Sequence, residues 1–322
     1  MSIFNNIMED NKYVFTYFRG RQNELIALQN LVNDNLLGDK IIPIIEPVKT
    51  ETTQLSSTFE AFANQRHRIG VICNPIVGEL INNSFNIIST ITAISDFQEY
   101  VIPVLYMNHG CEDIYQQLST HYSKSEIIGI CTQVEQIPTC VDFVNGESLQ
   151  YILIGNDREF TTQISSDLGE RILCVDRFLK RQRNVDYTEV EDEFFSSDHI
   201  NFENYGFKGF SDYSMIGHEF TDNGFAPRAV AIHIIYENNN QVFRIRHFVS
   251  YSNDDAKDPA RKFGEAVGQL TAWARGLSQR TRALNDFINL YRTENYRGLG
   301  FVKRLSIQHH LELVNRYFET NN

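Results

Sequence analysis

Polar and charged residues stand at the end of nearly every apolar run of this sequence, and they are the residues that could do chemistry. The set comprises Arg19, Glu46, Asn74, Asn108, His109, Gln133, Asn156, Asp157, Asp176, Arg177, Asp212 and Tyr213. Carboxylates are hard oxygen ligands that suit Mg²⁺, and guanidinium groups match the oxygens of phosphate. These residue types together are typical of a site for a phosphorylated or otherwise anionic ligand.

Glu46 is the member of this set with the strongest need for a partner. It stands in the run KIIPIIEPVK, between apolar residues and Pro47, where an unpaired carboxylate would be costly to bury. We expect a cation beside it, and either Arg19 or Lys49 could supply one. The asparagines of the set have a simpler explanation as well, because asparagine often caps helices and fits tight turns.

The apolar runs themselves indicate the elements that position these residues. Most runs are rich in β-branched residues and are followed by a helix-like stretch, although the stretch between the sixth and seventh runs is short for a full helix. The runs cover residues 13–18, 41–48, 69–74, 101–107, 127–133, 151–157, 172–177 and 207–211. A strand that is buried on both faces reads as a continuous apolar run, so this rhythm predicts repeated βα units with parallel strands.

About eight such units, with no GxGxxG motif after the first strand, favour a closed (β/α)8 barrel of the TIM type over an open doubly wound sheet. Fewer units would favour the open sheet. Residues 229–251 alternate as an antiparallel hairpin around a polar turn, and residues 256–322 read as helical. We expect one domain over residues 1–322 that includes both segments.

In a barrel of this type the functional residues lie at the C-terminal ends of the strands, because the βα loops gather there. Asp157, Asp176 and Asp212 follow three successive candidate strands and would line one arc of that rim. Together with Glu46 they form the predicted Mg²⁺ site, in which Glu46, Asp176 and Asp212 would be catalytic. The predicted ligand-binding residues are Arg19, Lys49, Arg177, Asn108 and Tyr213. The alternative is a ring of ion pairs that closes the barrel without catalysis.

Histidines offer a second candidate set, since the pKa of imidazole suits acid–base work near neutrality. They are His109, His218, His233 and His247. His233 and His247 alternate with apolar residues in the hairpin, which favours partly buried, hydrogen-bonded side chains instead. The sequence has no GxxxxGK[ST], HExxH, GxSxG or CxxC motif, which argues against P-loop ATPases, zincin proteases and α/β-hydrolases.

Composition narrows the class of partner. A formal charge of -12 at pH 7 argues against direct nucleic-acid binding, which depends on basic patches. The basic clusters at 180–183 and 275–282 read more simply as solvated helix faces.

The 5 cysteines include no CxxC pair, which indicates buried free thiols and a reducing cytoplasm. The N-terminal MSIFNNIMEDNKY resembles neither a signal peptide nor an anchor, and we expect no membrane contact.

Several longer motifs are similar to those of one known family. They are YFRGRQNELIALQNL at 17–31, PIIEPV at 43–48, GFSDY at 209–213, and the segment 231–270, which contains HFVSYSNDDAKDPARKFGEAVGQL. In these segments, and over nearly its whole length, the chain resembles the bacterial and phage-associated Beta protein family. The resemblance implies a barrel-like fold, an intracellular bacterial or phage setting, and a place among mobile-element or phage-defence genes. It implies no reaction and no catalytic residues.

Two functions are compatible with these observations. The leading hypothesis is a cytoplasmic metal-dependent phosphoester hydrolase that binds a phosphorylated or anionic ligand at the barrel mouth. The rival hypothesis is a non-catalytic scaffold, in which the hairpin and the C-terminal helices dock a protein such as a nuclease of a defence operon. Phe243, Ile245 and Phe248, in an otherwise polar region, motivate the second hypothesis. An oligomer is compatible with both.

Overall fold

Two compact units make up the chain, and each is assembled from separate stretches of sequence. The computed structural model describes residues 12–81, 84–221 and 228–321. The barrel unit comprises Met1–Arg21, Gly38–Asp176 and Asp198–Asp212, and the sheet-helix unit comprises Gln22–Leu37, Arg177–Ser197 and Tyr213–Asn322. The single domain that the sequence predicts stays a prediction. In the described part of the chain, no helix has the length and apolar character needed to cross a bilayer.

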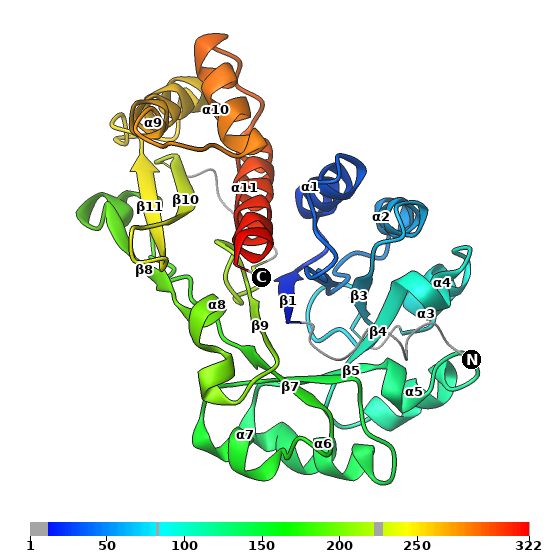
Figure 1. Cartoon of the computed structure of the whole chain (residues 1–322). Helices are drawn as coiled ribbons and strands as arrows, with labels where there is room; N and C mark the ends of the chain where they lie inside the picture. The colour runs from blue at the N-terminus through cyan, green and yellow to red at the C-terminus, as the bar shows by residue number, and fades with distance from the viewer. Residues whose placement is uncertain (1–11, 82–83, 222–227, 322) are drawn as a thin grey trace. The chain divides into compact units, whose positions relative to one another are not determined.

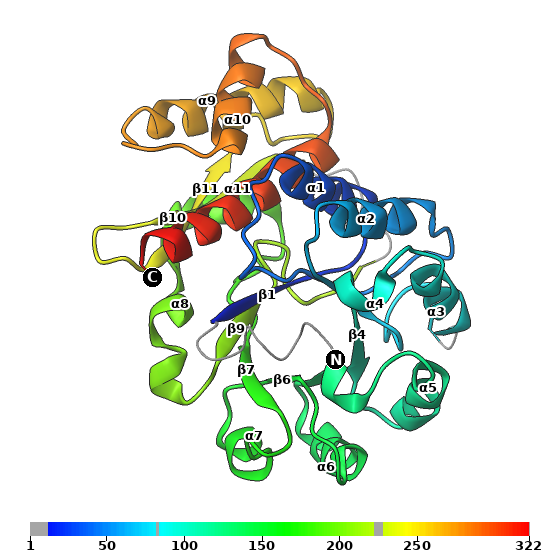
Figure 2. The ribbon, with the colours of Figure 1, turned by 45° about the vertical axis from the view of Figure 1, so that its right-hand side comes forward.

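Eight parallel strands close into a barrel in the first unit (Figures 1 and 2). In order around the ring they are β1 (Tyr13–Phe18), β2 (Ile44–Ile45), β3 (Ile69–Ile72), β4 (Val101–Tyr106), β5 (Ile128–Cys131), β6 (Tyr151–Ile154), β7 (Glu170–Cys174) and β9 (Gly209–Asp212). β1 pairs with both β2 and β9, which closes the ring. The predicted (β/α)8 barrel is therefore confirmed and the open sheet is excluded.

Helices alternate with these strands and lie outside the ring in Figure 2. They are α2 (Thr53–Asn64), α3 (Ser84–Thr92), α4 (Phe97–Tyr100), α5 (Cys111–Leu118), α6 (Ile137–Val144), α7 (Arg158–Gln163) and α8 (Asp198–Asn201). Most are short, and α7 has only 6 residues. The barrel is thus built from abbreviated βα units.

The register of the strands determines which side chains fill the barrel. Partners in neighbouring parallel strands face the same side, and successive side chains alternate between the two sides. The rings of Tyr13 and Phe15 on β1 lie 5.8 and 5.2 Å from the ring of Tyr151 on β6, which does not neighbour β1 in the ring. These contacts cross the interior, so Tyr13 and Phe15 point inward. By alternation Tyr17 and Arg19 also point inward, toward the C-terminal end of β1.

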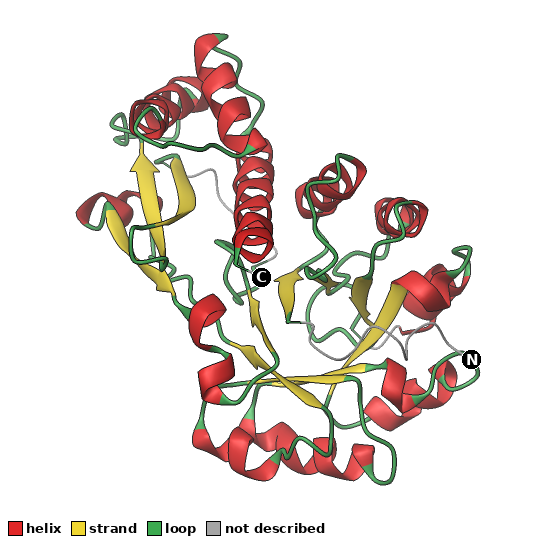
Figure 3. Cartoon of the chain, in the orientation of Figure 1, coloured by secondary structure: helices red, strands yellow, loops and turns green. Residues whose placement is uncertain are grey.

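The sheet-helix unit contains a three-stranded antiparallel sheet in the order β10-β11-β8 (Figure 3). β10 (Ala231–Glu237) and β11 (Phe243–Val249) form the predicted hairpin, and β8 (Asp192–Ser196) adds a third strand that the sequence did not indicate. The helices of the unit are α1 (Gln22–Asn33), α9 (Pro259–Ala274), α10 (Arg282–Arg292) and α11 (Leu299–Thr320). Side chains of α9 and α10 form one apolar core with Ile232, Ile234 and Phe248 of the sheet.

The apolar hairpin residues that motivated a docking surface are buried. Phe243, Ile245 and Phe248 are only 1%, 2% and 2% exposed. Phe248 belongs to the core under α9 and α10, and the ring of Phe243 lies 6.2 Å from the ring of Tyr317 on α11. The interpretation of these side chains as a surface for a partner was therefore wrong, because they pack against helices of their own unit.

Candidate functional site at the barrel mouth

The C-terminal ends of the barrel strands share one end of the barrel, here called the mouth, because all eight strands are parallel and form a ring. Arg19 directly follows β1 and Glu46 directly follows β2. Asn74, Asn108 and Asp176 lie two residues beyond β3, β4 and β7. The fold thus brings these five predicted residues to one end of the barrel unit.

Glu46 is completely buried at the mouth and accepts three hydrogen bonds. Its Oε2 accepts from the hydroxyl of Tyr17 and from Nη1 of Arg19, and its Oε1 accepts from the backbone N–H of Ile76 at 2.7 Å. Arg19 is also buried and donates to the Tyr17 hydroxyl at 2.9 Å. The cation that the sequence required beside Glu46 is therefore Arg19.

Tyr106 extends this network across the barrel interior. Its hydroxyl on β4 lies 2.8 Å from the hydroxyl of Tyr17 on β1. Tyr17 has a single hydroxyl proton, which Glu46 accepts, so Tyr106 must be the donor between the two hydroxyls. Burial, together with the nearby Glu46 carboxylate, raises the pKa of Tyr106 above its usual range. Tyr106 therefore keeps its proton at neutral pH and remains a donor.

Asn74 connects the ends of β3 and β4. Its Nδ2 donates to the carbonyl of Tyr106 at 2.9 Å and to Oδ1 of Asn108 at 3.0 Å, and its Oδ1 accepts from the backbone N–H of Tyr106 at 2.9 Å. Asn74 is thus a bridge between strands and not the helix cap that its residue type indicated. It also orients the half-buried side chain of Asn108.

Other members of the predicted site lie in different surroundings. Lys49 forms an exposed ion pair with Glu79, with 2.6 Å between Nζ and Oε1. Asp157 is exposed in the loop before α7. Asp176 is half-buried beyond β7, while Arg177 and Tyr213 belong to the sheet-helix unit.

Asp212 lies on the outer side of its strand. It pairs in register with Thr16, which alternates with the inward-facing Phe15 and Tyr17. Its neighbour Ser211 pairs with Phe15 and therefore faces the interior. Although Asp212 is buried, this alternation does not fit its predicted place in an acidic arc on the inner rim.

A metal site does not fit the residues at the mouth. Among the described residues, no three histidine, cysteine, aspartate or glutamate side chains are grouped so that they could hold a metal ion. Glu46 in particular receives three donors, one of them a guanidinium, whereas a carboxylate that binds Mg²⁺ directs its oxygens to the ion. The hydrogen bonds of Glu46 therefore use its carboxylate oxygens for Arg19, Tyr17 and Ile76.

A second polar cluster lies inside the sheet-helix unit. The Nδ1 atoms of His233 and His247 are 2.7 Å apart, and Nε2 of His247 lies 3.1 Å from Oε1 of Glu193. Oε2 of Glu193 accepts from Arg181 at 2.7 Å. Because a neutral His247 that donates from Nε2 to Glu193 accepts at Nδ1, His233 must donate between the two rings. Burial, followed by the charge of His247, lowers the pKa of His233 to about 3. The predicted partly buried, hydrogen-bonded histidines are confirmed, with His233 half-buried and His247 fully buried.

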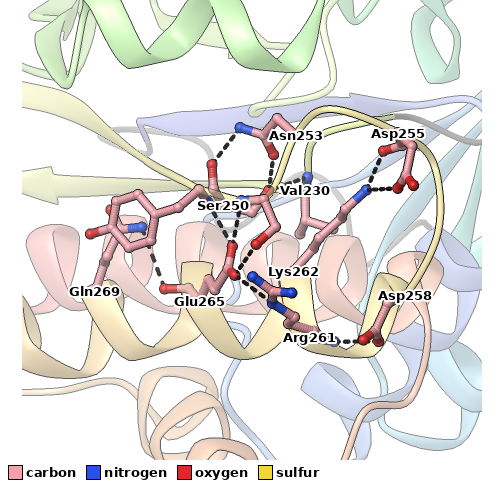
Figure 4. A network of polar contacts seen from close by, with 11 residues as sticks. Val230, Ser250, Asn253, Asp255, Asp258, Arg261, Lys262, Glu265 and Gln269 are labelled. Atoms are coloured by element: carbon pink, nitrogen blue, oxygen red, sulfur yellow. Dashed lines mark hydrogen bonds and ion pairs between the residues drawn. The ribbon is translucent and has the colours of Figure 1, made fainter.

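The longest of the family-like motifs forms a network that the sequence did not reveal (Figure 4). Oε2 of Glu265 accepts from the backbone N–H groups of Tyr251 and Ser252 at 2.7 and 2.8 Å, and Oε1 accepts from Arg261 at 3.1 Å. Burial alone would raise the pKa of Glu265, but the hydrogen bonds from Ser252, Tyr251 and Arg261 lower it to about 2. Asp258 caps α9 by accepting from the backbone N–H of Arg261 at 3.0 Å. The motif therefore attaches the loop after β11 to the first turns of α9.

The five cysteines are buried free thiols, as the sequence predicted. Burial raises the pKa of Cys73 to about 12 and the pKa of Cys111 to about 11. A thiol with such a pKa has almost no thiolate at neutral pH, so neither residue is a candidate nucleophile.

The sequence matches no protein-family model and no curated protein. The resemblance to the Beta protein family therefore stays a prediction.

Proposed function

We propose that the barrel unit binds a small phosphorylated or otherwise anionic molecule at its mouth, with Arg19 as the principal counter-charge. The observation that carries this proposal is the ion pair of Arg19 with Glu46, whose side chains are 9% and 0% exposed. Removing two charges from water costs several kcal/mol per ion, and apolar side chains often fill such a place at less cost. The pair lies at the end where barrels of this type bind ligands, so a use for charge there accounts for its retention.

Each residue of the network has a part in this proposal. Glu46 and Tyr17 fix the guanidinium of Arg19, so that it is positioned before a ligand arrives. Asn108 accepts from Asn74 with its Oδ1, which leaves its amide N–H groups to donate to oxygens of the ligand. Binding by prearranged donors of this kind avoids the entropic cost of ordering flexible side chains.

The proposal is one of binding and not of hydrolysis. Metal-dependent hydrolysis, the leading hypothesis from the sequence, needs carboxylates gathered around an ion, and the mouth lacks that arrangement among its described residues. A cytoplasmic setting and a place among defence genes belong to the proposal only through the resemblance.

Isothermal titration calorimetry with ribose 5-phosphate and with pyrophosphate tests the proposal. Asn108→Asp keeps the shape of the side chain but adds a negative charge at the mouth, and it should weaken binding about tenfold because like charges repel. Asn64→Asp is the matched control, since Asn64 is exposed at the C-terminal end of α2, next to the N-terminal end of β3. If neither probe binds the wild-type protein, or if both variants lose affinity equally, the mouth is not the anion site.

A further inference from the structure

The sheet-helix unit contains a cavity of about 740 Å³ along α9 and α10. Pockets that hold small organic ligands typically span roughly 300 to 1,000 Å³. The cavity lies wholly within one unit, and its lining runs from Ala260 on α9 to Tyr296 beyond α10. It is therefore large enough for a ligand of the size of a nucleotide.

Arginines dominate the charge of this cavity. Arg261, Arg275, Arg280 and Arg292 line it, whereas Glu294 is its one acidic lining residue within the described chain. The whole chain carries a net charge of -12, so this local excess of positive charge runs against the general composition. Guanidinium groups bind the oxygens of phosphate in pairs, and a basic concavity attracts anions.

The position of two of these arginines is already fixed. Nε of Arg261 donates to Glu265 at 3.1 Å, within the network of Figure 4 that attaches α9 to the preceding loop. Nε of Arg280 donates to the carbonyl of Ala274 at the end of α9 at 2.8 Å. Arg275 and Arg292 are exposed and remain adjustable. Two fixed and two adjustable guanidinium groups suit a ligand group with several negative oxygens.

The rest of the lining is apolar and aromatic. Phe263 and Tyr296 lie with ring centroids 5.3 Å apart, and both line the cavity with Tyr291. Gly264 leaves a gap on the α9 side, because a Cβ added there would have no heavy atom within 4 Å in the described structure. An aromatic wall beside an open gap can receive a flat ring by stacking.

Thr271 contributes a directional group. It lines the cavity on α9 and is 4% exposed, and its Oγ1 has no hydrogen-bond partner among the described residues. A buried hydroxyl without a partner is costly, and threonine in a helix readily occupies two χ1 positions. A ligand in the cavity could therefore accept from or donate to this hydroxyl after a small rotation.

We propose that this cavity binds a nucleoside phosphate. The arginines take the phosphate groups, the base stacks against the aromatic wall in the gap beside Gly264, and Thr271 bonds to a polar edge of the base or sugar. The site is separate from the barrel mouth and its existence does not depend on the function proposed for the mouth.

Calorimetry with AMP, ADP, GMP, adenosine and pyrophosphate tests this inference on the full chain. We expect at least one nucleotide to bind with a Kd below about 1 mM and at least about tenfold more tightly than adenosine. Gly264→Phe should fill the gap and abolish binding, whereas Gly264→Ala should leave it intact. Arg275→Gln with Arg292→Gln should weaken the nucleotide about tenfold or more while leaving adenosine unchanged.

Three results would overturn the inference. The first is the absence of binding by every nucleotide to the wild-type protein. The second is a pyrophosphate affinity that equals that of the nucleotides and is weakened to the same extent by Arg275→Gln with Arg292→Gln, which would mean a simple anion site in this cavity. The third is unchanged nucleotide binding by a Gly264→Phe variant whose melting temperature shows that it is folded. Asn108→Asp at the barrel mouth should not affect nucleotide affinity, which separates this test from that of the proposed function.

Discussion

The coupling between Arg19 and Glu46 can be measured with a double-mutant cycle. Glu46→Leu leaves a nearly buried guanidinium without its carboxylate, and removing one partner of such a pair costs about 3 to 5 kcal/mol. It also deprives the backbone N–H of Ile76 of its acceptor. Arg19→Met should be similarly costly, because Glu46 is then buried without a cation. The double variant removes both charges, so we expect it to be at least about 2 kcal/mol more stable than the sum of the single effects predicts.

Amide hydrogen exchange of peptides from β1, β2 and β4 is the assay, because it reports the free energy of opening in the barrel strands themselves. The exposed pair of Lys49 with Glu79, at 54% and 43% exposure, is the matched control, and its cycle should give a coupling of about 1 kcal/mol or less. Additive effects of Arg19→Met and Glu46→Leu, within about 0.5 kcal/mol, would refute the argument that the barrel contains a coupled buried pair.

Three further perturbations have defined outcomes. The pKa of His233 is about 3 in the folded protein and has its ordinary value in the unfolded chain. The unfolded state therefore binds more protons between about pH 3 and 6.5. The free energy of unfolding should consequently fall as the pH is lowered through that range. His233→Asn, which keeps a donor, should flatten this dependence in urea unfolding by up to about 1.4 kcal/mol per pH unit; an unchanged slope would contradict it. Glu265→Gln should lower the free energy of unfolding by about 1 to 2 kcal/mol at pH 7 and should not change it below about pH 2. The pKa of Glu265 is low in the folded protein, so its carboxylate stabilises the fold until the pH is low enough to protonate it. Gly209→Ala should lower the free energy of unfolding by about 3 kcal/mol or more, because the added Cβ would lie 2.2 Å from the carbonyl oxygen of Tyr13. Gly264→Ala is the control, and it should leave the thermal unfolding of the protein unchanged or stabilise it slightly.

The barrel was predictable because its strands are buried on both faces and therefore appear as continuous apolar runs. The need of Glu46 for a cation was also predictable, because burying an ionised side chain without a partner of opposite charge costs free energy. The strand β8 was not, because its sequence DEFFS begins with two acids and lies at the edge of its sheet, where one side chain, Phe194, is 51% exposed. A short edge strand has too little buried surface to leave a pattern.

The site was only partly predictable for a different reason. Tyr17 and Tyr106 read as core aromatics, and only the register shows that their hydroxyls meet across the interior. Alternation could have separated Asp212 from the inner rim, because in GFSDY it lies on the side opposite Ser211. That inference requires knowing which side of each strand faces inward, and a run that is apolar on both sides does not show this.

The interleaving of the two units has a consequence for synthesis on the ribosome. β1 is translated before the other barrel strands, but its neighbour β9 follows only after all the rest of them and β8 have been translated. The growing barrel therefore has an open edge until β9 has been translated. Likewise α1 cannot pack on α11 until residue 320 has been translated, and the two helices are then linked by the 2.8 Å ion pair of Glu24 with Lys303. Nascent chains that stop before residue 299 should consequently depend on chaperones to stay out of aggregates.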